Sequence, residues 1–552
     1  MTRRTTARVL ISREIIPWKS TRNKLMTEDN QPLPAQKSAW LLGLLSLLLY
    51  CLTAYGGIRS PDEEAIFRIG RALAEKGSFA LDRHEETLAG FSVARGTDGR
   101  IYSHYAPAQA VLLAPVIKAA LLINQSRWYE QTRLKIPISF CAGAASLKNF
   151  ILDRPPAEME EHALRFLTAW FMPLISSLLV VVFFFLMRRI TASSAAAVIT
   201  AGLLAFATPV WSYSGTFFKE PLAMLLVVSS LLLLAGNDPV FTAGTRRLRP
   251  LFPAGLLLGL AFTSHISAVL FVPFFIIYAG WPPATGQAAG PAGKLPVFIR
   301  QAAVFTAGFL VPALAFAAYN YARFENIWDV GRAASTITMN YPRLVLPFEG
   351  VLGFLVSPGK GLLWYCPLVM AGAWYWPRLH ARHRVLSFIL LSAMAFRLLF
   401  LACRTDWHGG FCLGPRHLLL IIPLLLIPLG LGVKEVLDRR PAVTDKKIMV
   451  PAGLFLAAAA QQIYFCLGEP ISFYYLVRNY FFSKGVSILS GNDLYFQWSA
   501  SPLLHLLKGR RGPWLLQDIA LTNYQLLPIL ITVFILLVIM AAACLIRTHK
   551  KV

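Results

Sequence analysis

The stretch RSPDEE, residues 59–64, stands between the first apolar run of the chain and an amphipathic segment. Ser60 followed by Glu63 has the spacing of a capping box, and Pro61 takes the first helical position, where its missing N–H is not needed. A helix is therefore predicted to begin here. The residues that follow place apolar side chains on one face and charged ones on the other, which is typical of a helix lying along a membrane surface. Asp62 is then expected at a membrane–water boundary.

The composition indicates a helical protein that crosses a membrane many times. The chain has 552 residues, of which 56% are apolar, and several apolar runs are long enough to span a bilayer. Its 53 basic residues against 28 acidic ones are explained by a positive cytoplasmic face, so nucleic acid is not an expected partner. The seven cysteines form no CxxC pair and no zinc spacing. Cys403 and Cys412 share a short loop, where a disulfide is allowed but not required.

Thirteen apolar runs are candidate spans. Basic residues near both termini place both ends in the cytoplasm, which requires an even number of crossings. The second run carries Lys118 together with Pro107 and Pro115, which favours a half-buried helix over a span. Leaving it out gives about twelve crossings and puts the other short basic loops inside. The candidate runs are 39–56, 106–123, 164–187, 194–211, 217–235, 251–264, 266–281, 298–319, 351–376, 385–402, 417–432, 448–465 and 524–546.

This topology divides the chain into three parts. Residues 1–38 form a basic cytoplasmic tail, and residues 39–432 form a transmembrane module. The module's first outer loop, 57–163, is long and is expected to contain interfacial helices. Residues 433–552 form a final pair of spans around an outer segment, 467–522, that is rich in aromatic residues.

Acidic residues of the expected outer face are the first candidates for chemistry. Glu63 belongs to the capping box, which leaves the carboxylate of Asp62 available; alternatively, both acids serve only the helix dipole. Lys219 and Glu220 lie at the mouth of an apolar span, where an ionisable group is expensive and a functional role is the default interpretation. The competing interpretation is that these two residues only form a salt bridge with each other.

Basic and aromatic residues form the second set of candidates. Asp98-Gly99 predicts a turn, and Arg100 and His104 after it are spaced to present donors to an anionic headgroup. The alternative is an interfacial aromatic belt with a snorkelling arginine. The stretch SPGKG, residues 357–361, breaks a helix beside Lys360 and could cradle a phosphate, or be only a helix break.

A further basic candidate opens an apolar span near the end of the transmembrane module. Arg416 stands at the start of the run 417–432, again an anion-binding position. His408 and His417 are either ligands or plain hydrogen bonders. No serine-hydrolase, zinc-protease or paired-cysteine motif is present, so hydrolase chemistry is not indicated.

The order of these features resembles the GT-C membrane glycosyltransferases. The shared features are an inside N-terminus, one span, a long outer loop that opens with Asp62-Glu63, the stretch YSHYAP at 102–107, and a row of further spans. The chain is most similar to bacterial members of the protein O-mannosyltransferase and lipid A aminoarabinose transferase group. SPGKGLLWYCP (357–367) and WHGGFCLGPR (407–416) resemble blocks of bacterial members. The resemblance covers residues 39 to about 432.

The resemblance implies an all-α GT-C-like fold with a site on the outer face. The catalytic aspartate of the superfamily maps to Asp62, and a second acid of a later span maps to Glu220. The lysine of the group's block before the embedded helix is replaced by His104. The implied residues are Asp62, Glu63 and Glu220 for catalysis, Arg100, His104, Lys360 and Arg416 for the donor phosphate, and Tyr102, Tyr105, Trp407 and His408 for acceptor or sugar.

The expected function is transfer of a hexose or pentose from a polyprenyl-phosphate donor in the bacterial inner membrane, with inversion, on the outer side. Asp62 would act as general base, or as a carboxylate that positions the acceptor or a metal. A divalent cation, Mg²⁺ or Mn²⁺, held by Asp62 and Glu220, is left open as cofactor. Expected partners are the lipid-linked donor, membrane lipids and an acceptor that the sequence does not identify. A transporter or flippase of an anionic lipid or lipid-linked sugar is the alternative, and a lipid-binding scaffold is a third.

Overall fold

A computed structural model gives the fold of the chain. The residues that it describes are 35–54, 60–81, 93–126, 164, 168–238, 247–281, 291–331, 343–439, 446–468, 470–483 and 492–509. Most of the predicted basic tail, the second half of the first outer loop and the last predicted span lie outside them. The predictions for these segments therefore stay predictions.

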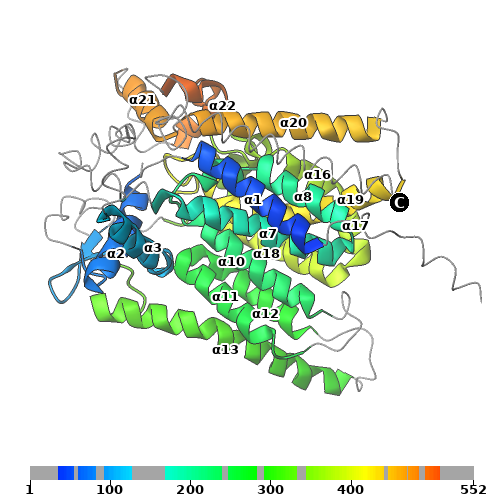
Figure 1. The fold of residues 1–552 in the computed structure, drawn as a ribbon, viewed down its shortest axis with the longest axis horizontal. Coiled ribbons are helices and arrows are strands. Elements are labelled where there is room, and N and C mark those ends of the chain that lie inside the picture. Colours follow the sequence, from blue (N-terminus) through cyan, green and yellow to red (C-terminus); the bar gives the residue numbers. More distant parts are fainter. Residues whose placement is uncertain are drawn as a thin grey trace, which may run out of the picture.

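Long apolar helices run side by side and form the body of the molecule (Figure 1). Phe183 and Phe184 are fully buried within one large apolar core. Two of the helices are entered through a 3-10 turn, η4 (Ile266–Phe271) before α12 and η5 (Arg416–Ile421) before α19. The helices of the body are α1 (Ala35–Thr53), α7 (Phe171–Thr191), α8 (Ser194–Phe206), α10 (Glu220–Gly236), α11 (Leu251–Ser264), α12 (Val272–Gly280), α13 (Pro291–Phe324), α18 (Arg384–Ala402), α19 (Ile422–Arg439) and α20 (Lys446–Leu467).

The prediction of a helical protein with many membrane segments is confirmed. Within the described residues, five helices are long and apolar enough to cross a membrane, and shorter apolar helices lie among them. The number of crossings stays a prediction. The five long helices are Ala35–Thr53, Phe171–Thr191, Lys294–Phe324, Arg384–Ala402 and Arg416–Arg439.

The run 351–376, predicted as one span, is divided into short helices. The helix α14 (Phe348–Val356) ends where Ser357 adopts an extended backbone before Pro358, because the residue before a proline avoids the helical conformation. After the break, the chain continues through α15 (Leu362–Tyr365), α16 (Leu368–Trp374) and α17 (Trp376–Arg382). The other short elements are α9 (Val210–Ser214), α21 (Pro470–Ser483), η6 (Asn492–Phe496), η7 (Trp498–Ala500), α22 (Pro502–His505) and η8 (Leu506–Gly509).

The described residues of the predicted first outer loop form a small unit at one end of the bundle. There α2 (Pro61–Lys76) packs against α3 (Ala108–Asn124), away from the middle of the long helices (Figure 1). Between them, the strands β1 (Val93–Arg95) and β2 (Ile101–Ser103) pair as an antiparallel hairpin around a turn at Gly99, whose φ is +75°. The turn was predicted, but the two short strands were not, so the all-α description omits this hairpin.

The predicted start of α2 is confirmed in its details. The Ser60 hydroxyl accepts from the Glu63 backbone N–H at 3.2 Å, and the Glu63 carboxylate accepts from the Ser60 N–H at 3.0 Å. The other oxygen of Glu63 accepts from the backbone N–H of Phe217 at 3.0 Å. Glu63 therefore both caps α2 and fastens it to the segment that leads into α10.

Replacing Glu63 by glutamine should destabilise the fold, because one of two buried backbone N–H groups loses its acceptor. We expect a loss of about 1–3 kcal/mol, the usual effect of leaving a buried polar group unsatisfied. The measurement is the thermal unfolding midpoint of the detergent-purified protein. Glu75→Gln is the control, since Glu75 pairs with Arg71 on a more exposed part of the same helix. Equal midpoints for both variants would contradict the prediction.

Candidate functional site

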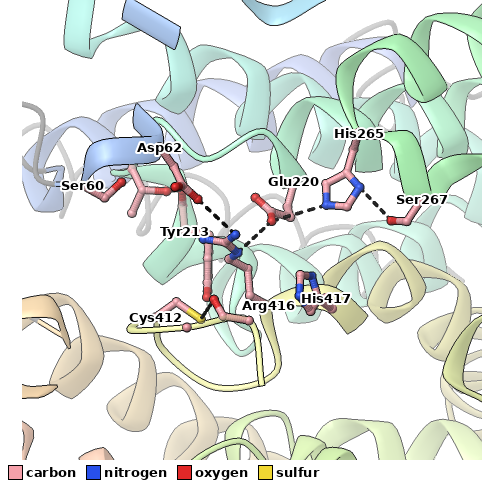
Figure 2. A network of polar contacts seen from close by, with 12 residues as sticks. Ser60, Asp62, Tyr213, Glu220, His265, Ser267, Cys412, Arg416 and His417 are labelled. Atoms are coloured by element: carbon pink, nitrogen blue, oxygen red, sulfur yellow. Dashed lines mark hydrogen bonds and ion pairs between the residues drawn. The ribbon is translucent and has the colours of Figure 1, made fainter. Parts of the chain in front are cut away.

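Three charged residues from distant parts of the chain meet at the end of the bundle next to α2. The guanidinium of Arg416, the first residue of η5, lies between two carboxylates (Figure 2). Its Nη2 is 3.2 Å from an oxygen of Asp62, and its Nε is 3.1 Å from an oxygen of Glu220. Asp62 belongs to the first turn of α2 and Glu220 is the first residue of α10, so helix ends supply both acids.

Asp62 lies at the edge of this cluster, with 19% of its side chain exposed. Its carboxylate also accepts a hydrogen bond from the Tyr105 hydroxyl, and the Lys219 ammonium lies 4.2 Å from the centre of the Tyr105 ring. Burial raises the pKa of the Asp62 carboxyl, but the charges of Arg416 and Lys219 and the Tyr105 hydroxyl together outweigh it. The pKa of Asp62 therefore lies below its ordinary value, and the group is ionised at neutral pH.

Glu220 is the buried member of the pair of acids, with no exposure to solvent. One of its oxygens contacts both Arg416 and, at 3.5 Å, the Nε2 atom of His265. A carboxylate in such a position is costly unless a cation lies against it. Arg416 supplies this cation, so Glu220 and Arg416 depend on each other.

The polar contacts continue from Glu220 into the bundle (Figure 2). The Nδ1 atom of His265 lies 2.7 Å from the Ser267 hydroxyl oxygen. Arg397 of α18 donates to that oxygen at 2.9 Å, to the Ser267 carbonyl at 2.6 Å and to the His417 carbonyl at 2.8 Å. A continuous series of contacts thus runs from Asp62 to a buried arginine inside an apolar helix.

Arg416 and Lys219 bring positive charge next to the carboxylate of Asp62, at the partly exposed edge of the cluster. Because charges in an apolar surrounding interact strongly, this positive charge favours an anion close to Arg416.

The structure brings together some of the predicted site residues. Arg416 contacts both Asp62 and Glu220, and Tyr105 donates to Asp62. Both carboxylate oxygens of Glu63 are bound to backbone N–H groups, so this acid holds α2 in place.

Lys360 lies in another environment. Its ammonium is buried and donates to the carbonyl oxygens of Gly410 at 2.7 Å and of Cys412 at 2.6 Å, and it lies 3.2 Å from the Cys412 sulfur. The ammonium also lies 5.0 Å from the ring centre of Tyr474 and 5.0 Å from that of Tyr495. Lys360 therefore fixes the loop that leads to Arg416, and its three N–H groups already face acceptors in this loop.

Trp407 and His408 belong to the same loop. Trp407 is buried and donates its indole N–H to Glu349 at 3.1 Å. His408 accepts from the Gly410 backbone N–H, and its ring stacks on Tyr495 with the ring centres 4.5 Å apart. Burial lowers the pKa of His408 to about 3, so it is neutral at physiological pH. Both side chains support the loop.

The predicted phosphate-binding residues of the hairpin lie apart from Arg416. Arg100 is exposed and lies 3.8 Å from Asp98, at the turn. Tyr102 donates its hydroxyl to Asp98 at 2.7 Å. His104 is buried, with its ring centre 4.8 Å from that of Tyr105. Tyr105, two residues after the end of β2, contacts the cluster through its hydrogen bond to Asp62.

Three residues of the cluster were not among the predicted site residues. Arg397 carried a signal, because an arginine inside an apolar run is expensive and marks a function by default. His265 lies between the candidate runs 251–264 and 266–281 and was not a candidate. Ser267 carries no charge and gave no signal.

The predicted metal ligands do not form a cation site as they are arranged. Arg416 lies between Asp62 and Glu220. In the part of the chain that the structure describes, no group of three or more histidine, cysteine, aspartate or glutamate side chains gathers in a metal-binding arrangement. Cys403 and Cys412 are both free thiols.

Among known proteins, the chain is similar to solved structures. No family model and no curated protein sequence matches the chain. Among solved structures, the chain is similar to the oligosaccharyltransferase of Archaeoglobus fulgidus in its apo form, at 13% identity and a TM-score of 0.43, covering 85% of this chain and 60% of that one. It is also similar to ArnT from Cupriavidus metallidurans bound to undecaprenyl phosphate. There the identity is 12% and the TM-score 0.44, covering 86% of this chain and 79% of that one.

A third similar structure is the archaeal enzyme, AglB, in complex with an inhibitory peptide and a dolichol-phosphate, at 15% identity and a TM-score of 0.43. This match covers 78% of this chain and 56% of that one, so the present chain spans a little over half the length of the archaeal enzyme.

Replacing Arg416 by methionine should raise the pKa of the Asp62 carboxyl, because Arg416 is the nearest charge that lowers it. A hydrophobic carbodiimide modifies only the protonated carboxyl, so modification of Asp62 should begin at a higher pH in the variant than in the original protein. Peptide mass spectrometry measures the modified fraction against pH. The control is Arg404→Met, which removes an arginine that pairs with Asp406 instead. An unchanged pH profile in a folded Arg416→Met protein would contradict the assignment.

Proposed function

We propose that the chain is a membrane glycosyltransferase that moves a sugar from a polyprenyl-phosphate donor to an acceptor. One observation carries the proposal: Arg416 is held between Asp62 and Glu220 at the end of an apolar helical bundle. A lipid-linked donor requires apolar surface for its chain, a cation for its phosphate and a carboxylate near its sugar. The cluster combines these features at one place.

Binding of the donor phosphate would rearrange the ion pairs of Arg416. Glu220 is fully buried, while Asp62 is partly exposed. An anion that arrives from the membrane boundary therefore competes with Asp62 for the guanidinium and leaves the pair with Glu220 in place. Once Asp62 loses this contact, its pKa rises towards the ordinary value of a carboxyl, and it becomes a stronger base. The proposal thus couples donor binding to activation of Asp62.

The reaction that follows is a single displacement. The acceptor hydroxyl attacks the anomeric carbon and the bond from that carbon to the phosphate oxygen breaks, so the configuration inverts. Asp62 takes the proton of the hydroxyl. Arg416 and Lys219 stabilise the negative charge that develops on the departing lipid phosphate. The transferred group would be a hexose or a pentose.

The remaining predicted residues take supporting roles in this proposal. Lys360, Trp407 and His408 hold the loop that presents Arg416. Arg100, on the exposed turn of the hairpin, would meet lipid headgroups beside the site. We also propose that the end of the bundle with α2 and α3 faces outward from a bacterial inner membrane, with both chain ends in the cytoplasm.

Replacing Asp62 by asparagine should lower the transfer rate at least about 100-fold, because general-base catalysis contributes on the order of 10²–10⁴. The assay follows a labelled sugar from a polyprenyl-phosphate donor in proteoliposomes. Asp98→Asn is the control, since that carboxylate lies at the hairpin turn and bonds Tyr102. Undiminished transfer by a normally inserted Asp62→Asn protein would remove Asp62 from the chemistry.

Arg416→Lys keeps the positive charge but loses the planar fork that reaches both carboxylates and the phosphate. We expect the donor KM to rise about tenfold or more, since hydrogen bonds to charged groups contribute about 1.5–3 kcal/mol. The measurement is the dependence of transfer on donor concentration. Arg378→Lys serves as the control, because Arg378 pairs with Glu435 outside this cluster. An unchanged donor KM would show that Arg416 does not bind the donor phosphate.

A further inference from the structure

Two charged residues from different helices contact the same pair of chain segments. Glu220, at the start of α10, contacts His265 just before η4 and Arg416 at the start of η5. On the opposite side, Arg397 in the middle of α18 contacts η4 and η5 as well. The contacts thus close into a ring of four elements: α10, the start of η4, α18 and the start of η5.

Arg397 makes its part of the ring with three hydrogen bonds. Two go to the hydroxyl and carbonyl oxygens of Ser267, and one goes to the carbonyl of His417. Its guanidinium also lies 5.4 Å from the ring centre of Phe271, the last residue of η4. Only a planar fork of several donors can bind two separate segments in this way.

The position of Arg397 is expensive. The side chain is fully buried inside a helix that is long and apolar enough to cross a membrane. The hydrogen-bond acceptors that the structure assigns to it are neutral oxygens. An apolar residue would join the helices at a lower desolvation cost. The arginine is therefore explained better by the chain segments that its hydrogen bonds orient.

The bonds of Arg397 also orient His265. Arginine only donates, so the Ser267 hydroxyl oxygen accepts from it and its own proton is available to the Nδ1 atom of His265, at 2.7 Å. The imidazole then carries its proton on Nε2, which faces the carboxylate of Glu220. Arg397 therefore holds the segments of both His265 and Arg416, which contact Glu220.

We propose that Arg397 is a positioning residue for the transfer reaction. It holds the starts of η4 and η5 together, and so keeps His265 and Arg416 directed at Glu220 without touching the substrate. This inference rests on the proposed function, because the position of Arg416 matters only if Arg416 binds the donor phosphate.

The ring itself is tested by hydrogen–deuterium exchange of the full-length protein in detergent. Ser267→Ala should raise amide exchange about fivefold in both 266–271 and 416–421, the effect of about one lost hydrogen bond. Arg397→Lys should raise it further in both. Ser264→Ala is the matched control, because Ser264 is a buried serine whose hydroxyl has no hydrogen-bond partner among the described residues. Faster amide exchange confined to 266–271, or equal exchange in all variants, would show that Arg397 does not link the two segments.

The positioning role is tested by a double-mutant cycle on sugar transfer. Arg397→Lys should lower kcat at least about tenfold in the original protein, and should add little in the Arg416→Lys background. The same fold-loss in both backgrounds would overturn the role, since a merely structural defect acts independently of Arg416. If the original protein transfers no sugar, the proposed function fails, while the exchange experiment still decides the ring.

Discussion

Glu220 is an acid without solvent exposure inside an apolar bundle, and the rest of the site depends on the cation that this requires. Removing one partner of such a pair leaves a buried charge uncompensated and costs about 3–5 kcal/mol. Arg416 is therefore fixed in position by Glu220. Because the same guanidinium reaches Asp62, the small unit formed by α2 and α3 is tied electrostatically to the transmembrane helices.

The charged groups of the cluster gather where helices begin. Asp62 belongs to the first turn of α2, Glu220 opens α10 and Arg416 opens η5, while His265 directly follows α11. Helix ends leave backbone groups that need polar surroundings, and they lie where an apolar segment meets the membrane boundary. Polar side chains at these positions are consequently compatible with an otherwise apolar bundle.

The sequence alone was sufficient for features that depend on neighbouring residues. The start of α2 followed from Ser60 and Glu63, and Arg416 was a candidate because it opens an apolar run. The arrangement of Arg416 between two acids was not predictable, since it depends on contacts between residues hundreds of positions apart. The hairpin was missed because its strands have three residues each, too short for a visible alternation. Lys360 looked like a phosphate ligand beside two glycines, yet carbonyl groups of another loop surround it.

The contacts of Lys360 have a consequence for how the protein matures during synthesis. Its ammonium lies against the rings of Tyr474 and Tyr495, and the Gly359 N–H donates to the Tyr495 carbonyl at 2.9 Å. The loop before Arg416 is thus supported by residues translated long after it. A nascent chain still emerging from the ribosome can insert its first helices in order. The contacts that support the loop before Arg416 are completed only when the segment that carries Tyr474 and Tyr495 has left the exit tunnel and folded back.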